Sequence, residues 1–567
     1  MRTSILNGLL FTGLCLAVAS AQQPVIPADA QSAMDHFSKS ALRANMRFLA
    51  DDLLEGRGTG TRGQEIAAHF VAAQFDAFGL EPAGAGVPST RGFGSARDGV
   101  EEPPHGSFFQ PVPFREVTTD PAGCEASITH NGKTARLKWG EDFLSAGNPL
   151  QPDISVEAPL VFVGFGVVNP GRNYDSYKGV DVKGKIIVIL PGAPPGFPAN
   201  ERAHFASTLE KARQAVAHGA VGIISLWTPV SEASLPWSRM PNQIESPRYR
   251  WLDSNGMPND TFKELRGAAL LSMKAAEELL QGSAQPFPEV LKAAAAGTPR
   301  SFPLAATARL HVVSKHRQVN SPNVVGILRG SDPVLAQEYV VYSAHTDHMG
   351  IGKPINGDRI YHGAVDDGSG TSALIELARA YSSMGKRPAR SILFLATTAE
   401  EQGLLGADYF ARFPTVPKGN LVADINMDGA SVFYAFKDVI GDEHSTLGDT
   451  LTQVAGQLGL EVSPDPMPEQ NGFVRADHYA FVRQGIPALS VGEGLKAKDP
   501  KVDGRKFVEN WIETRYHAPS DDMNQPLDFD ATIQYMQITF LLGYDVAQQH
   551  DRPSWKQGDF FGKLFGK

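Results

Sequence analysis

Cysteine is nearly absent from this chain of 567 residues, which contains only Cys15 and Cys124. Cys15 lies in an N-terminal segment that we expect to be removed, so Cys124 would be the only cysteine of the mature protein. An intramolecular disulfide is therefore excluded, and stability must come from packing or from bound metal. Long basic runs are missing too, and the formal net charge is −10. This charge balance argues against nucleic acid as a partner.

No hydrophobic run after the N-terminus is long enough to cross a membrane. At the N-terminus, Arg2 precedes an apolar stretch that ends near Val18, and Ala19, Ser20 and Ala21 follow it. This is the pattern of a secretory signal peptide, since the apolar stretch is shorter than the ~20 residues of a spanning helix. We predict that residues 1–21 are a signal peptide and that the protein is exported to the periplasm or the extracellular medium, without stable membrane insertion. The sequence indicates no oligomeric state.

The length and composition predict a folded protein of two or more domains. Apolar residues make up 42% of the chain and charged residues 20%, as in soluble globular proteins, and 567 residues exceed one ordinary hydrophobic core. The sequence between about residues 130 and 300 differs in character from its flanks and reads as a self-contained α+β domain. The predicted division is residues 1–21, 22–130 (first part of the main domain), 131–300 (inserted domain), 301–550 (main domain) and 551–567 (C-terminal tail).

Strands and helices alternate from Asn323 onward. The runs "YVVYSAH", "SILFLATTAEE", "LVADINMD" and "GIPALSVG" read as strands, and "TSALIELARAY" reads as a helix with one apolar face. Such alternation predicts an α/β fold with a mixed, largely parallel sheet and flanking helices. In sheets of this kind, ligands bind beyond the carboxyl ends of the strands.

Acids and histidines recur where these strands end. One such residue is usually structural, since an Asp before a helix caps it and paired acids suit a helix's first turn. Together they would bring many negative charges to one edge of the sheet, and burying unpaired charges is very costly. A pair of divalent metal ions would resolve this, because carboxylates and imidazoles are natural ligands for such ions. The residues are His345, Asp347, Asp366, Asp367, Glu400, Glu401, Asp428 and His517.

The motifs that carry these residues resemble those of a known family. In chain order they read "AHTDHMG", "GAVDDGSG", "TTAEEQGLLGA", "NMDG" and "YHAPSDD". They are similar to the dizinc exopeptidases of metallopeptidase family 28, which include bacterial zinc aminopeptidases and the glutamate carboxypeptidase II group. The resemblance covers about residues 320–545 and the segment "MRFLADDLLEGRGTGTRG". It implies the zinc exopeptidase fold, and residues 131–300 resemble the protease-associated domain that some members carry as an insertion.

The resemblance implies a centre of two zinc ions. Asp366 would bridge the two ions. His345 and Asp428 would complete the first site, and Glu401 and His517 the second. Other divalent metals, such as cobalt or manganese, also suit oxygen-rich sites.

Two further roles follow from the same resemblance. Glu400 would be the general base, and Asp347 would hold the ring of His345 through its free nitrogen. Because adjacent residues on an extended chain point to opposite sides, Glu400 and Glu401 could divide proton transfer and metal binding between them. Members of the family also have a cis peptide bond after the bridging aspartate, here between Asp366 and Asp367.

The chain departs from the family pattern near "NGFVRADH". Ala476 stands where a serine is usual, and Phe473 stands where some aminopeptidases have a tyrosine that stabilises the oxyanion. Arg475 could replace that phenol, bind a substrate carboxylate or form a bridge to Asp477.

The leading hypothesis is a secreted zinc aminopeptidase that acts on peptides. A carboxypeptidase of the glutamate carboxypeptidase type is the first alternative. A binding protein that kept the fold and lost catalysis is the second, although all implied ligands and the base are present. We expect the loops at 228–260, including Trp237 and Arg239, and at 493–514 to shape substrate specificity.

Overall fold

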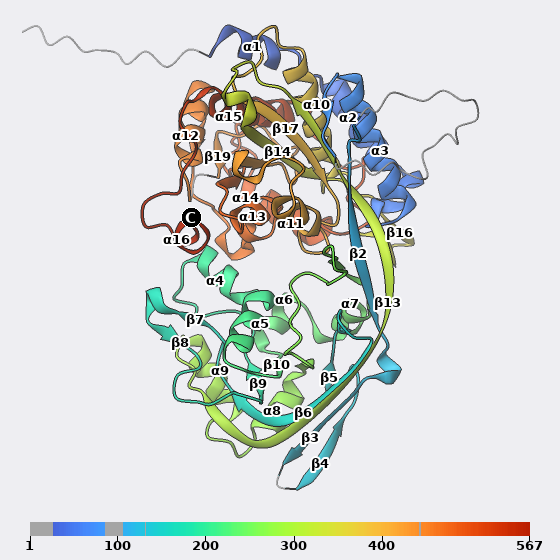
Figure 1. The fold of residues 1–567 in the computed structure, drawn as a ribbon, viewed down its shortest axis with the longest axis vertical. Helices are drawn as coiled ribbons and strands as arrows, with labels where there is room; N and C mark the ends of the chain where they lie inside the picture. Colours follow the sequence, from blue (N-terminus) through green and yellow to red (C-terminus); the bar gives the residue numbers. More distant parts are fainter. Residues whose placement is uncertain (1–25, 85–105, 131, 442–443, 567) are drawn as a thin grey trace, which may run out of the picture.

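The computed structural model describes residues 26–84, 106–130, 132–441 and 444–566, so the expected signal peptide and Cys15 lie outside the described residues. The chain forms two lobes, one above the other in Figure 1. The upper lobe combines the N-terminal helices with the C-terminal half of the chain, and the lower lobe holds the segment between them. A 15-stranded sheet runs through both lobes. In the part of the chain that the structure describes, no helix has the length and apolar character needed to span a membrane.

The upper lobe confirms the predicted α/β fold. Four of its strands run parallel, in the order β21–β18–β14–β17, and β13 pairs antiparallel with β17. Successive residues of β14 belong to different cores: Tyr342 packs with helices on one face of the sheet, and Val341 packs with helices on the other. The strands are β13 (Phe302–Leu328), β14 (Tyr339–His345), β17 (Ser391–Thr397), β18 (Leu421–Asn426) and β21 (Ala488–Ser490). The covering helices are α2 (Lys39–Leu49), α3 (Arg62–Ala77), α10 (Gly368–Ser382), α12 (Leu447–Gln457) and α15 (Phe529–Gln548) on the first face, with α11 (Leu405–Arg412) and α13 (His478–Val482) on the second.

The lower lobe has its own α+β core. Strands β6, β9, β10 and β12 run parallel, and β5 closes the edge antiparallel to β12. Their apolar side chains form a cluster separate from the upper cores. This lobe corresponds to the expected inserted domain, and its kinship with protease-associated domains stays a prediction. The elements are β5 (Phe143–Leu144), β6 (Asp153–Phe162), β9 (Ile186–Ile189), α4 (Ala199–Ala206), α5 (Thr208–Ala217), β10 (Gly222–Leu226), β12 (Ala268–Leu271), α8 (Met273–Leu280) and α9 (Phe287–Ala295).

One long strand joins the lobes. β13 has 27 residues and pairs with β17 above and with β6 and β3 (Glu125–His130) below, while β2 (Phe109–Thr119) runs beside it. In Figure 1 this strand curves along one side of the whole molecule. β3 therefore lies in the lower lobe, although the predicted limit at residue 130 assigned it to the first part of the main domain. The exact domain limits stay a prediction.

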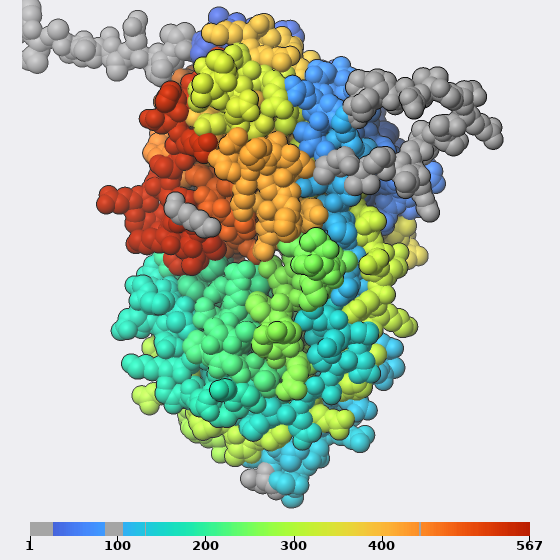
Figure 2. All heavy atoms as spheres, in the orientation of Figure 1, coloured from blue at the N-terminus to red at the C-terminus, as the bar shows by residue number. Residues whose placement is uncertain are grey.

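The C-terminal residues pack between the lobes rather than extending as a tail. Helix α16 (Phe560–Phe565) places Phe561 in the upper core, where the ring is 0% exposed and stacks on Phe473 at 5.2 Å. The neighbouring Phe560 contacts the ring of Phe205 in the lower lobe at 5.7 Å. Figure 2 shows these C-terminal residues, in red, at the seam between the lobes.

Candidate metal centre

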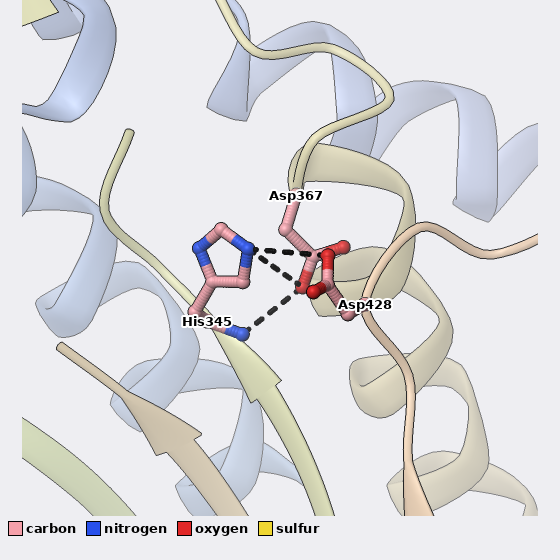
Figure 3. Close-up of side chains that lie close together, drawn as sticks. All are labelled: His345, Asp367 and Asp428. Atoms are coloured by element: carbon pink, nitrogen blue, oxygen red, sulfur yellow. Dashed lines mark hydrogen bonds and ion pairs between the residues drawn. The ribbon is translucent and has the colours of Figure 1, made fainter. Parts of the chain in front are cut away.

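Three of the predicted ligands meet beyond the carboxyl ends of the upper strands. His345 is the last residue of β14, Asp366 precedes helix α10, and Asp428 follows β18. The Nε2 atom of His345 lies 3.3 Å from Oδ1 of Asp366 and 3.5 Å from Oδ1 of Asp428. Figure 3 shows the His345 ring facing Asp428 and the neighbouring Asp367.

The other two predicted ligands meet on the far side of Asp366. The Nε2 atom of His517, in the loop after helix α14 (Gly504–Thr514), lies 3.2 Å from Oδ2 of Asp366 and 3.1 Å from Oε2 of Glu401. Asp366 thus presents one carboxylate oxygen to each group. The structure brings together all five residues that the resemblance implied as ligands. The Asp366–Asp367 peptide bond is cis, as the resemblance also implied.

The donor atoms fit divalent cations. The buried Nε2 atoms of His345 and His517 make no hydrogen bond of good geometry to any described residue. They face carboxylate oxygens at 3.1–3.5 Å. Two ligands that each lie ~2.0–2.1 Å from a tetrahedral zinc ion are about 3.3 Å apart. The separations within both groups are therefore those of residues that could share an ion.

Two neighbouring residues add further donor atoms. Asp367 lies with His345 and Asp428, and His348 lies with Asp366 and Glu401. The carboxylate of Asp367 accepts the backbone N–H groups of His345, Gly370 and Gly429 at 2.9–3.0 Å. These hydrogen bonds favour a role in fixing the surrounding loops over a role as a metal ligand. Nδ1 of His348 lies 2.7 Å from Oε1 of Glu401, so this histidine contacts a candidate ligand directly.

Glu400 and Glu401 lie on a turn between a strand and a helix. β17 ends at Thr397, and α11 begins only at Leu405, so the alternative in which the two acids open a helix is wrong. The side chain of Glu401 faces His517, while Glu400 is 9% exposed and lines a cavity beside the candidate ligands.

The environment shifts the pKa values of these two glutamates in opposite directions. Burial raises the pKa of Glu400 well above its usual range; His345 opposes this rise, and the carboxylates of Asp428 and Glu401 add to it. Burial also opposes ionisation of Glu401, but its contacts with His348 and His517 prevail and lower its pKa to about 2. Opposite pKa shifts in two adjacent carboxyl groups are typical of a division between acid–base and electrostatic roles.

Asp347 contacts its predicted partner differently from the expectation. Nδ1 of His345 donates to the backbone carbonyl of Asp347 at 3.1 Å, whereas the nearest carboxylate oxygen is 3.8 Å away. That carboxylate instead accepts the backbone N–H of Glu400 at 3.1 Å and the hydroxyl of Thr59 at 3.0 Å. Asp347 thus orients the histidine through its main chain and the Glu400 turn through its side chain.

The cavity beside the ligands has a volume of about 400 Å³. Tyr516 lines it, and its ring stacks on that of His517 at 3.8 Å. Nη2 of Arg475 donates to the Tyr516 hydroxyl at 3.0 Å, whereas Asp477 accepts a hydrogen bond from Thr397. The Arg475–Asp477 bridge considered from the sequence is therefore not formed. Tyr516 thus places a phenol in this cavity, whereas Phe473 has none. Its position directly before His517 in "YHAPSDD" could have identified it from the sequence.

Comparison with known proteins agrees with this geometry. Residues 323–541 match peptidase family M28. This part of the chain is similar to that family. A crystallised aminopeptidase from Aneurinibacillus sp. strain AM-1 has the same fold over 91% of this chain and 96% of its own, with a TM-score of 0.51 at 18% identity.

Curated relatives match shorter parts of the chain. A "Probable zinc metalloprotease" of Pyrenophora tritici-repentis is 39% identical over 264 residues, which cover 42% of this chain and 59% of the relative. The rat "Aminopeptidase NAALADL1" is 36% identical over 138 residues, which cover 24% of this chain and 17% of the relative. A "Glutamate carboxypeptidase 2 homolog" of Caenorhabditis elegans is 26% identical over 341 residues, which cover 53% of this chain and 40% of the relative. The chain therefore spans less than two thirds of the length of these curated relatives.

Two residues outside the predicted set hold the loops of the candidate metal centre in place. Arg57 is 1% exposed, and its guanidinium donates to the carbonyls of Thr346, His362 and Gly363 at 2.7–2.9 Å, as well as to that of Leu49. It thereby joins the loop after His345 to the loop before Asp366. Asp521 accepts the N–H groups of Val365 and Asp366 at 3.0–3.1 Å. Both residues lie in quoted motifs, "EGRGTGTRG" and "YHAPSDD", but neither was assigned a role from the sequence.

We expect Arg57→Met to destabilise the protein strongly. The change would remove the Arg57 donor from four buried carbonyl groups, of which that of Gly363 keeps the N–H of Gly368, and a buried unsatisfied polar group costs about 1–3 kcal/mol. A loss of roughly 3–5 kcal/mol in the free energy of unfolding should follow, measured by urea denaturation. Arg62→Met at the exposed start of α3 is the control and should change stability by no more than about 0.5 kcal/mol. Equal stabilities for the two variants would contradict the bracing role of Arg57.

Proposed function

We propose that the protein is an exported, metal-dependent exopeptidase that removes N-terminal residues from peptides. The observation that carries the proposal is the position of Asp366, whose two carboxylate oxygens face His345 on one side and His517 on the other at 3.2–3.3 Å. The M28 match and the aminopeptidase and zinc metalloprotease relatives support it.

The metal ions are two zinc ions, or other divalent cations of similar preference. His345, Asp366 and Asp428 would hold one ion, and Asp366, Glu401 and His517 would hold the other. When bound, the ions supply Lewis-acid chemistry to the peptide carbonyl and to the attacking water.

The chain's own residues then handle protons and developing charge. Glu400, buried beside the cavity, takes a proton from the attacking water and returns it to the leaving amine. The Tyr516 hydroxyl accepts a hydrogen bond from Arg475, so its own proton is available to the oxyanion that forms on the scissile carbonyl. Asp347 keeps Glu400 in place through the backbone N–H of that glutamate.

The wall of the same cavity favours an aminopeptidase over a carboxypeptidase. Beyond the candidate ligands it carries the acids Asp465 and Glu493 among apolar side chains, including Phe433 and Trp511. Carboxylates in such a pocket attract the ammonium group of a peptide N-terminus. Arg475, which is exposed in the same cavity, is the feature that keeps the carboxypeptidase alternative open, because a guanidinium can bind a substrate carboxylate.

A pair of substrate types tests this function directly. The zinc-loaded protein should hydrolyse leucine p-nitroanilide and should lose that activity on dialysis against a chelator. N-acetylated peptides with a free acidic C-terminus should be poor substrates, since no N-terminal ammonium is present. Preference for the acetylated peptides would favour the carboxypeptidase, and no turnover of either type would favour a binding protein.

The roles of the two adjacent glutamates should be distinguishable in a pair of variants. Glu400→Gln should keep two metal ions per chain and lose turnover by about 10²–10⁴-fold, as expected for a missing general base. Glu401→Gln should lose metal first, because it removes an ionised ligand. Metal content by mass spectrometry and kcat on the same preparations distinguish the two, and near-normal kcat in Glu400→Gln would mean that the base lies elsewhere.

A further inference from the structure

A second cavity, of about 770 Å³, lies between the two lobes. Its wall combines lower-lobe residues from α5 and β10 with upper-lobe residues from the Glu401–α11 turn. The wall carries five basic side chains and two acidic ones, in a chain whose net charge is −10. The basic residues are Lys211, Arg213, Arg248, Arg250 and Arg483, and the acidic residues are Glu210 and Asp260.

Some of these arginines are neutralised within the protein. Asp260 of the lower lobe lies 3.1 Å from Arg483 and 3.3 Å from Arg412, both in the upper lobe, and 3.8 Å from Arg213. This network holds the lobes together across the cavity. The Asp260 carboxylate is thus shared among three arginines, and its charge also favours the ionised form of Arg250.

Arg248 and Arg250 have no such partner. They alternate along strand β11 (Arg248–Trp251) with Tyr249 and Trp251, whose rings are buried on the opposite face. Arg250 donates only to the carbonyl of Tyr249, and Arg248 makes no hydrogen bond or ion pair with any described residue. Burial lowers the pKa of both guanidinium groups; the charge of Arg250 lowers the pKa of Arg248 further, whereas Asp260 partly offsets the effect on Arg250. Two unpaired guanidinium groups held side by side suit a carboxylate ligand.

The cavity adjoins the candidate metal centre. Gln402 and Gly403 line it and directly follow Glu401, so they lie within about 8 Å of that residue along the chain. Val474 also lines it, while its neighbours Phe473 and Arg475 line the cavity at the metal centre. Residues adjacent in the chain therefore line the two cavities. An extended tripeptide spans ~10 Å, which exceeds the chain distance from Glu401 to Gly403.

We propose that Arg248 and Arg250 bind a carboxylate of the peptide substrate downstream of the bond that is cleaved. The inference rests on the proposed exopeptidase function and adds a substrate class. The substrates are short peptides whose N-terminus enters the cavity at the metal centre and whose carboxylate reaches Arg248 and Arg250 in the cavity between the lobes. The carboxylate can be the peptide's own C-terminus or an acidic side chain. Both sources share the same recognition chemistry.

Four peptides and the zinc-loaded full chain test the proposal. Leu-Gly-Gly is compared with its C-terminal amide, and Leu-Gly-Glu amide with Leu-Gly-Gln amide. At least one carboxylate peptide should show a KM about tenfold or more below that of its neutral partner, and the pair that differs identifies the source. In the Arg248→Ala/Arg250→Ala double variant, the ratio of the KM of the neutral peptide to that of its carboxylate partner should fall to within about twofold of one. Arg248→Lys/Arg250→Lys should keep part of the ratio, and Arg136→Ala on the exposed strand β4 (Lys133–Leu137) should keep all of it.

Binding to the Glu400→Gln variant gives a second readout that does not depend on turnover. Calorimetry should show tighter binding of the carboxylate peptide than of its amide, and the added arginine changes should remove the difference. Equal KM and equal affinity within both peptide pairs, or a ratio that survives in the alanine double variant, would overturn the proposal. Because leucine p-nitroanilide carries no downstream residue, its hydrolysis would still establish the proposed function in that case.

Discussion

Buried carboxylates at one edge of a sheet need compensating positive charge, and the upper lobe is built around this constraint. Asp366, Asp367 and Glu400 are each less than 10% exposed and lie within contact distance of a single imidazole, that of His345. Isolated charges in such a place would cost several kcal/mol each. The protein meets part of the cost with backbone N–H donors and histidines, and two bound cations would meet the rest.

The two cavities differ in the sign of the charged side chains in their walls. The cavity at the metal centre carries Asp465 and Glu493 beyond its ligands, whereas the inter-lobe cavity carries Arg248 and Arg250. A short peptide has the complementary polarity, with an ammonium group at one end and a carboxylate at the other. The lower lobe would therefore contribute to substrate orientation, while the chemistry stays at the end of the upper strands.

Sequence patterns predicted the parts of this arrangement that are local. The run "YVVYSAH" became β14, which is buried on both faces, and the five motifs placed His345, Asp366 and His517 together. What the sequence did not show depends on long-range contacts. Arg57 bonds carbonyls up to 306 positions away, and nothing beside it in the chain marks that role. Residues 228–260 were expected to form a loop that shapes specificity, but they include helices α6 (Pro229–Ser234) and α7 (Met240–Glu245) and strand β11. Arg248 and Arg250 of β11 line a cavity, whereas Trp237 donates to the carbonyl of Gly140 and packs in the lower lobe.

Diffraction from crystals of the zinc-loaded wild-type protein, recorded above and below the zinc absorption edge, tests the central claim most directly. The account predicts two anomalous peaks about 3.5–4 Å apart, one on each side of the Asp366 carboxylate. One peak should lie beside His345 and Asp428, and the other beside Glu401 and His517. A single peak in crystals of fully active protein, or two peaks that do not share Asp366, would contradict the account.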